Sequence, residues 1–240
     1  MKVLKDIQGI IFDYGGTIDT NSRHWAEVLW AKYVEHRVPV DKESFREAYV
    51  FGERALAKYP FVQPWHTFRD VLSIKTKLQM EWLAEQRKLA TDERQLQSYA
   101  EKVADSCYEY VLEVLNATRP VVEELARKYK LVLVSNFYGN IQTILKDFGL
   151  FDFFVEIVES SVVGVRKPDP AIYKLGVEAM GSEAKNVLVV GDSFSKDVVP
   201  AKAVGCRVAW LKGEGWGGEV IDESVPDVIL TSLVQLLALL

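Results

Sequence analysis

Short apolar runs, each followed by a stretch with helical signals, constrain the fold of this chain most strongly. Each run has the length and the apolar composition of a strand that is buried on both faces. Strands that alternate with helices pair in parallel through right-handed crossovers. The sequence therefore predicts an α/β fold with a doubly wound, Rossmann-like parallel sheet. The predicted strands are Ile7–Phe12, Leu131–Val134, Phe154–Val158, Val187–Val190, Val208–Leu211 and Val228–Leu230.

Proline and glycine mark the ends of the intervening helices. Pro120 suits the first turn of a helix, which we predict over Pro120–Lys128. Gly205 follows a second predicted helix, Lys196–Val204, as a C-terminal stop. The glycine-rich piece Gly213–Gly218 is predicted to form a loop near the mouth of the site, and it lacks the spacing of a dinucleotide or P-loop motif.

The segment from residue 20 to residue 115 departs from this alternation, because its apolar residues recur at helical spacing throughout. Pro60 and Pro64 mark a loop between two of its helices. The simplest account is an α-helical cap domain over residues 20–115, inserted after the first strand. Residues 1–19 and 116–240 then form the α/β catalytic core. Ligands of such sheets bind beyond the carboxyl ends of the strands, so we expect the cap to lie over that end.

The composition narrows the classes of function. The chain has 240 residues, a hydrophobic content of 49% and a formal net charge of −5, values typical of a soluble globular protein without a broad nucleic-acid surface. It has neither an apolar run of the ~18 residues that a membrane span needs nor a signal-peptide core. Cys107 and Cys206 show no metal-ligand spacing, as is usual in a reducing compartment. We therefore expect a cytoplasmic protein that acts on a small molecule, with no nucleic acid or membrane as partner.

Polar side chains of the kinds used in phosphoryl transfer follow four of the predicted strands. Asp13 follows the first strand, Ser135 the second, and Asp192 with Asp197 the fourth. Lys167 stands at the end of the segment that follows the third strand. An aspartate in this position can attack phosphorus and form a covalent aspartyl-phosphate, which divides one hard step into two. Asp13 is therefore the predicted nucleophile.

Carboxylates at the same edge also suggest a metal site. Asp13 and Asp192 can share a Mg²⁺ ion, which prefers oxygen ligands, and the backbone carbonyl of Gly15 is a natural further ligand. Without a cation, carboxylates crowded in this way repel one another.

The remaining polar groups are suited to holding a phosphoryl group. Ser135 and the amide of Asn136 can donate hydrogen bonds to phosphoryl oxygens, and Lys167 supplies fixed positive charge. Asp197 is a candidate for holding Lys167 or a metal-bound water in place.

At these residues the chain resembles the haloacid dehalogenase superfamily. The resemblance covers essentially the whole chain and implies a hydrolase with a helical cap of the C1 type, a Mg²⁺ cofactor and a phosphatase-like reaction. It also implies that Thr17 supports the site, and that the chain is a monomer or a homodimer. The four segments that carry it are Phe12–Thr17, Val134–Asn136, Arg166–Pro170 and Gly191–Asp197.

Gly15 departs from the pattern of the family's phosphatases, which have Asp there to protonate the leaving group and later activate water. General acid–base help of this kind is worth roughly 10²–10⁴-fold in rate. Asp19 is the nearest replacement on the same loop, but we favour a role for it as the cap of the first helix of the inserted domain.

Several reactions dispense with that acid, and the sequence leaves them open. The leading hypothesis is Mg²⁺-dependent transfer from a small phosphorylated metabolite, favouring acyl phosphates or anhydrides, whose leaving groups are weak bases. A carbon–halogen hydrolase is the first alternative. A phosphonate hydrolase is another, and it would need a cap lysine that the sequence does not single out among Lys32, Lys42, Lys58, Lys75 and Lys77. A catalytically degraded binding or regulatory protein is the last.

Overall fold

A parallel sheet of six strands forms the centre of the molecule. The computed structural model describes residues 4–214 and 221–240, so the predicted loop Gly213–Gly218 lies mostly outside the described residues. The strands lie in the order β3-β2-β1-β4-β5-β6, and every neighbouring pair is parallel. The predicted doubly wound fold is thereby confirmed. The strands are β1 (Gly9–Phe12), β2 (Lys130–Ser135), β3 (Glu156–Glu159), β4 (Val187–Gly191), β5 (Arg207–Leu211) and β6 (Val228–Leu230).

Helices cover both faces of this sheet, as the near-continuous apolar strands require. On one face, Ile10 and Phe12 of β1 pack in the same cluster as the end of the long helix α4 (Glu93–Ala126) and as α5 (Ile141–Asp147). On the other face, Ile11 belongs to a cluster with α7 (Ala171–Met180), α8 (Val199–Val204) and a π-helical turn at Phe194–Val198. The short α6 (Ser160–Val163) follows β3.

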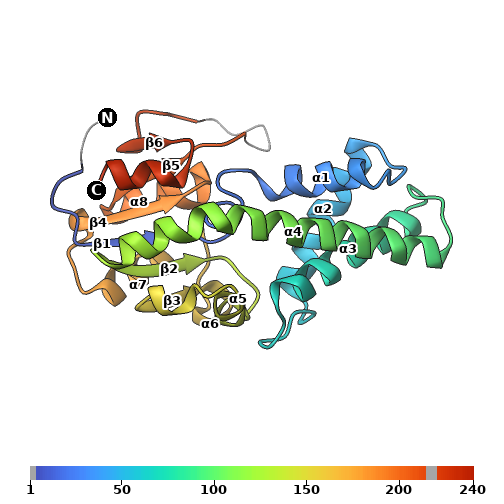
Figure 1. Cartoon of the computed structure of the whole chain (residues 1–240), viewed down its shortest axis with the longest axis horizontal. Coiled ribbons are helices and arrows are strands. Elements are labelled where there is room, and N and C mark those ends of the chain that lie inside the picture. Colours follow the sequence, from blue (N-terminus) through green and yellow to red (C-terminus); the bar gives the residue numbers. More distant parts are fainter. Residues whose placement is uncertain (1–3, 215–220) are drawn as a thin grey trace.

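The inserted segment is helical, and it extends away from the sheet as a second lobe of the molecule (Figure 1). It consists of α1 (Trp25–Glu35), α2 (Lys42–Lys58), α3 (Phe68–Glu85) and the first part of α4. The figure shows α4, in green, running the length of the molecule from the helical lobe to the sheet.

Helix α4 corrects one prediction. Pro120 does not begin a helix, because it lies inside the 34-residue α4. A proline removes only one helical hydrogen bond, and here the buried side chains around it, among them Thr118, Val121 and Val122, keep the helix packed on both sides of that point. The predicted boundary between residues 115 and 116 also falls inside α4, and the domain limits remain a prediction.

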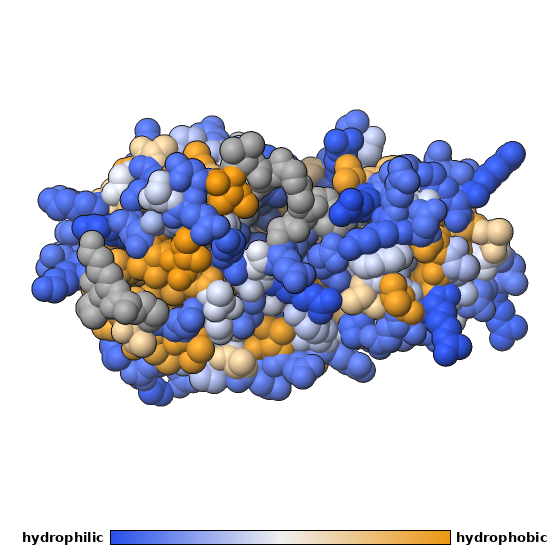
Figure 2. All heavy atoms as spheres, turned by 90° about the horizontal axis from the view of Figure 1, so that it is seen from above, coloured by the Kyte–Doolittle hydropathy of each residue, from blue (hydrophilic) through white to orange (hydrophobic). Residues whose placement is uncertain are grey.

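The visible surface is mostly polar. Figure 2 shows charged and polar residues over most of this face, with apolar residues gathered in separate patches over the sheet lobe and in smaller ones over the helical lobe. Among the described residues, no helix is both long and apolar enough to cross a membrane.

Leu133, in the middle of β2, tests how far the sheet depends on burial. Its side chain is fully buried, and its strand pairs with β1 on one side and β3 on the other. We expect Leu133→Ala to lower the free energy of unfolding by about 2–5 kcal/mol, because it removes apolar contacts and leaves a cavity. Urea unfolding would measure this. The exposed Lys130→Ala at the start of the same strand should change it by less than about 0.5 kcal/mol, and an equal loss in both variants would contradict the prediction.

Candidate active site

Three neighbouring strands bring the predicted site residues to one edge of the sheet. Asp13 follows β1, Ser135 ends β2, and Asp192 follows β4. The pairing continues one residue past the end of β1, where the backbone N–H of Asp13 donates to the carbonyl of Val190 over 2.9 Å. Because β2, β1 and β4 are adjacent, side chains far apart in the sequence line one cavity.

Lys167 joins this edge through its ammonium group. Its Nζ lies 2.6 Å from Oδ1 of Asp13 and 2.7 Å from Oδ1 of Asp197. All three side chains are at least nine-tenths buried. Burial works against a charged lysine, yet the two carboxylates prevail and raise the pKa of Lys167. Burial, partly offset by Lys167, raises the pKa of Asp13 to about 6.

Asp197 is fixed from three sides. Its Oδ1 accepts hydrogen bonds from Lys167 Nζ and from the Tyr173 hydroxyl, at 2.7 and 2.6 Å. Its Oδ2 accepts one from the backbone N–H of Ser193 at 2.9 Å. A Cβ at Gly191 would lie 2.4 Å from the Asp197 Cγ, so this carboxylate occupies the space that the glycine leaves. With both oxygens engaged, Asp197 is suited to holding Lys167.

Asp192 completes the group of carboxylates. One ligand atom from each of Asp13, Asp192 and Asp197 lies within 4.8 Å of the others. The one hydrogen bond described for the Asp192 carboxylate comes from Thr17 Oγ1, at 3.4 Å. Burial and the nearby charges of Asp197 and Asp13 raise the pKa of Asp192 well above its ordinary value. A half-buried carboxylate with so little compensation fits a divalent cation, which Asp13 and Asp192 would hold.

Asn136 has a role that the sequence did not reveal. Its side chain accepts a hydrogen bond from the Lys167 backbone N–H at 2.9 Å, and its Nδ2 donates to the Lys167 carbonyl at 3.0 Å. This pair of bonds ties the loop after β2 to the Lys167 segment, so it positions the ammonium. Ser135 is buried and lines the cavity beside Asn136.

Gly15 borders open space. A Cβ built on this residue would meet no atom within 4 Å, and its φ lies outside the left-handed region. The backbone would therefore accept an L side chain here, and the residue lines the same cavity as Asp13. Neither packing nor backbone geometry enforces the absence of a carboxyl at this position.

Asp19 is not a helix cap, and the preference stated for that role is wrong. Helix α1 is capped instead by His24, whose side chain accepts from the N–H of Ala26. Asp19 is fully buried, and its two oxygens accept hydrogen bonds from Gly16 N at 2.7 Å and Trp25 Nε1 at 2.8 Å. Burial raises the pKa of its carboxyl to about 7. Asp19 thus joins the loop after β1 to the first helix of the inserted segment.

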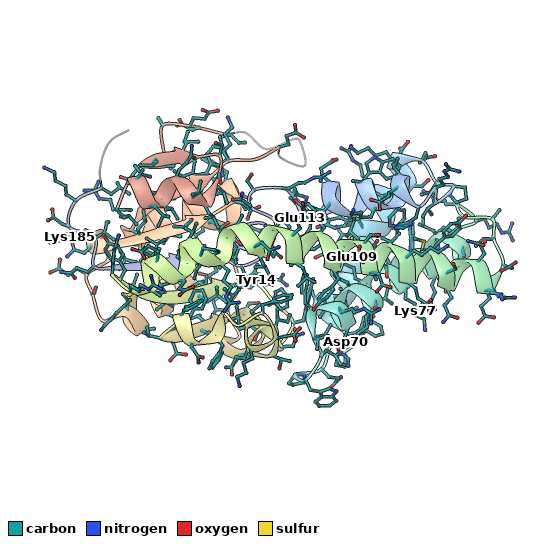
Figure 3. The ribbon with its side chains drawn as sticks, in the orientation of Figure 1. Tyr14, Asp70, Lys77, Glu109, Glu113 and Lys185 are labelled. Atoms are coloured by element: carbon teal, nitrogen blue, oxygen red, sulfur yellow. The ribbon has the colours of Figure 1, made fainter. Side chains whose placement is uncertain are left out.

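The cavity over Asp13 has a volume of about 570 Å³, enough for a small metabolite. The inserted helices close one side of it with apolar side chains, among them Trp25, Phe68 and Leu72. Figure 3 shows Tyr14, the neighbour of Asp13, at the junction between the sheet lobe and the helical lobe.

Two residues of the helical lobe and one of the sheet lobe place polar groups in this cavity, and no role for them was predicted from the sequence. Lys75 of α3 lies 2.7 Å from Oε1 of Glu53 of α2, and the Tyr138 hydroxyl donates to Oε2 of Glu53 at 3.1 Å. The spacing of α3 contained a signal for Lys75, because it falls three or four residues after Val71 and Leu72, on the same buried stripe. Glu53 and Tyr138 stand in different lobes, and no local pattern connects them.

Comparison with known sequences places the chain among hydrolases. The profile of the haloacid dehalogenase-like hydrolases matches residues 7–205. Over nearly its whole length, the chain is 26% identical to a glyceraldehyde 3-phosphate phosphatase of Pyrococcus furiosus, covering 94% of that protein. It is 28% identical to a phosphoglycolate phosphatase of Pectobacterium atrosepticum, covering 95%. The match to a haloacid dehalogenase-like hydrolase domain-containing protein of Danio rerio, at 37% identity, spans only 43% of either chain.

Solved structures share the fold. The hydrolase YfnB of Bacillus subtilis, bound to magnesium, has a TM-score of 0.59 at 18% identity, with 97% of each chain covered. A dehalogenase in an intermediate complex has a TM-score of 0.64 at 16% identity, with 99% of each chain covered. At these low sequence identities, the structural similarity shows only that the fold is shared. Since the family profile covers most of the chain, the protein belongs to the haloacid dehalogenase-like hydrolases.

Proposed function

We propose that this hydrolase removes a phosphoryl group from a small phosphorylated metabolite with the help of Mg²⁺, through an aspartyl-phosphate on Asp13. The observation that carries the proposal is the charge arrangement on the cavity floor: Asp13 bridged by Lys167 to Asp197, with the weakly compensated Asp192 carboxylate beside it. The full-length matches to phosphatases of small phosphorylated compounds support it. Residues 20–115 would act as the cap that screens the cavity.

The reaction has two displacements at phosphorus. In the first, a carboxylate oxygen of Asp13 bonds to phosphorus, and the bond from phosphorus to the leaving oxygen breaks with its electron pair going to that oxygen. In the second, water attacks the phosphorus of the aspartyl-phosphate. The Asp13–phosphorus bond then breaks, which restores the carboxylate and releases inorganic phosphate.

Each polar residue of the site has its own role in the proposed reaction. Lys167 holds Asp13 in place and supplies positive charge to the phosphoryl oxygens, and Asp197 holds Lys167. Ser135 and the backbone amide of Asn136 would donate to the phosphoryl group. Asp13, Asp192 and the Gly15 carbonyl would hold Mg²⁺, which neutralises charge on the transferred group when bound.

The open space at Gly15 decides which leaving groups suit the site. A carboxylate released from an acyl phosphate is a weak base and departs without a proton, whereas an alkoxide needs one. Asp19 lines the same cavity, but the hydrogen bonds from Gly16 N and Trp25 Nε1 fix its carboxyl and favour its charged form, which makes it a weaker proton donor. We therefore infer that acyl phosphates or anhydrides are turned over faster than alkyl phosphates.

The alternative reactions find less support. Displacement of halide needs no metal, so it gives no account of Asp192 beside Asp13. A phosphonate hydrolase needs a neutral cap lysine to form a Schiff base. Lys75 does line the cavity, but its pairing with Glu53 outweighs burial and raises its pKa, which keeps the amine protonated.

Comparison of two substrates tests the proposed reaction. We expect Mg²⁺-dependent release of phosphate from acetyl phosphate to be at least about 10²-fold faster than from an alkyl phosphate, because only the second needs a general acid. A colorimetric phosphate assay with and without chelator measures both rates, and Asp13→Asn should abolish them. Halide release from 2-haloacids that chelator leaves unchanged would overturn the proposal.

Gly15→Asp tests the missing acid directly. The open space at this position accommodates the side chain, so we expect alkyl phosphate hydrolysis to rise by about 10²-fold or more. Acetyl phosphate hydrolysis should rise less, because its leaving group needs no proton and only the attack of water gains from the new carboxyl. Gly15→Asn is the matched control, since it has the same size and no acidic proton. An equal gain in both variants, or a gain in neither, would show that this position does not limit the rate.

Asp192→Asn tests the cation site without relying on activity. In the metal-free protein the change removes a half-buried carboxylate that neighbouring carboxylates repel. Tm should therefore rise by about 2–4 °C for each kcal/mol of repulsion relieved. When Mg²⁺ is present at a hundred times its Kd, the free energy of unfolding of the parent protein should rise by about 2.7 kcal/mol. The variant should show no such rise. Thermal unfolding with and without Mg²⁺ measures both effects. The exposed Glu183→Gln serves as the control, and a Mg²⁺-induced shift retained by Asp192→Asn would argue against the site.

A further inference from the structure

The cap side of the cavity carries an ion pair whose carboxylate faces the space above Asp13. Lys75 Nζ and Glu53 Oε1 are 2.7 Å apart, and both residues line the cavity. The Lys75 side chain is only 9% exposed, whereas that of Glu53 is 34% exposed. Because Oε1 is buried against Lys75, a ligand in the cavity would meet this carboxylate at Oε2, which also accepts from the Tyr138 hydroxyl.

The surroundings keep both members charged. Burial alone would raise the pKa of Glu53, but the adjacent Lys75 prevails and lowers it. Lys75 Nζ also lies 5.8 Å from the ring centroids of Trp25 and Tyr138, which favour a cation. The pair is thus a neutral unit, and its ammonium is already compensated by Glu53.

Tyr138 extends this unit from the other lobe. It stands on the loop after β2, and its hydroxyl donates to Glu53 Oε2. A hydroxyl that donates its proton keeps a lone pair with which to accept from a ligand. This side of the cavity therefore offers two hydrogen-bond acceptors, the Glu53 carboxylate and the Tyr138 oxygen. Apolar side chains such as Leu72 line the cavity beside them.

We propose that Glu53 and Tyr138 form a subsite for the organic part of the substrate, which selects hydroxylated, uncharged groups and rejects groups that carry a free carboxylate. This rests on the proposed function in that the phosphoryl group is taken to sit at Asp13. A ligand hydroxyl would donate to Glu53 or Tyr138, whereas a ligand carboxylate would meet the like charge of Glu53 with Lys75 already compensated. Lys196 lines the same cavity and its charge also acts on Glu53, but it is exposed on the sheet lobe, where solvent screens its attraction for a ligand carboxylate.

A matched pair of ligands tests the subsite by binding alone. Glycerol 3-phosphate and 3-phosphoglycerate differ only in a hydroxymethyl group against a carboxylate. Isothermal titration of the Mg²⁺-loaded protein gives both dissociation constants, with inorganic phosphate as the reference. We expect glycerol 3-phosphate to bind about tenfold tighter than 3-phosphoglycerate. Equal binding, tighter binding of 3-phosphoglycerate, or no gain of either over phosphate would overturn the subsite.

Glu53→Gln makes the test specific, because it removes the repelling charge and leaves Lys75 uncompensated. The preference should fall about tenfold or invert in favour of 3-phosphoglycerate. Tyr138→Phe, which removes one hydroxyl and no charge, should weaken glycerol 3-phosphate binding alone. Glu47→Gln is the matched control, since Glu47 lies on the same helix, pairs with Lys88 and does not line the cavity. A preference unchanged in Glu53→Gln would refute the assignment.

The two proposals fail in different ways. If glycerol 3-phosphate binds tighter than 3-phosphoglycerate but no substrate releases phosphate in the presence of Mg²⁺, the proposed reaction is overturned and the subsite is supported. If acetyl phosphate releases phosphate but the two ligands bind equally, the proposed reaction is supported and the subsite is overturned.

Discussion

The contact of the Lys167 ammonium with Asp13 and Asp197 is the interaction on which the arrangement of the site depends. Parallel strands that end at one edge of the sheet bring three carboxylates within a few ångströms of one another, and such a group is costly to bury. Lys167 offsets part of that charge, and Asn136 fixes the backbone from which it extends. What remains uncompensated is concentrated at Asp192, which is why a divalent cation fits there. The proposed nucleophile, cation site and phosphate-binding charge would therefore all follow from one electrostatic arrangement.

The helical lobe has a separate role, because it determines what the reacting groups can meet. It covers the cavity with apolar side chains and with one internally neutralised ion pair, Lys75 and Glu53. Asp19 and Trp25 connect this lobe to the loop that carries Asp13, and Tyr138 connects it to the loop after β2. Contacts of this kind link the position of the cap to the geometry of the chemistry.

Gly15 bears on the proposed reaction without bearing on the fold. The position is open and unstrained, so a carboxyl would fit, and in the proposed reaction its absence would remove a proton donor while leaving the sheet and the other polar groups in place. The chemistry of the leaving group then becomes decisive. A site that provides electrostatic stabilisation without a general acid is best suited to groups that depart as weak bases.

The sequence by itself determined the parallel sheet and which polar residues gather at its edge, because apolar strands and the residues that end them are local patterns with a fixed geometric consequence. Tertiary structure decided the rest. Pro120 lies within α4 because packing outweighed a local signal, and Asp19 bonds to Gly16 and Trp25 where local reasoning favoured a cap. The meeting of Glu53 with Tyr138 depends on how two lobes pack, and no spacing along a single chain encodes a contact of that kind.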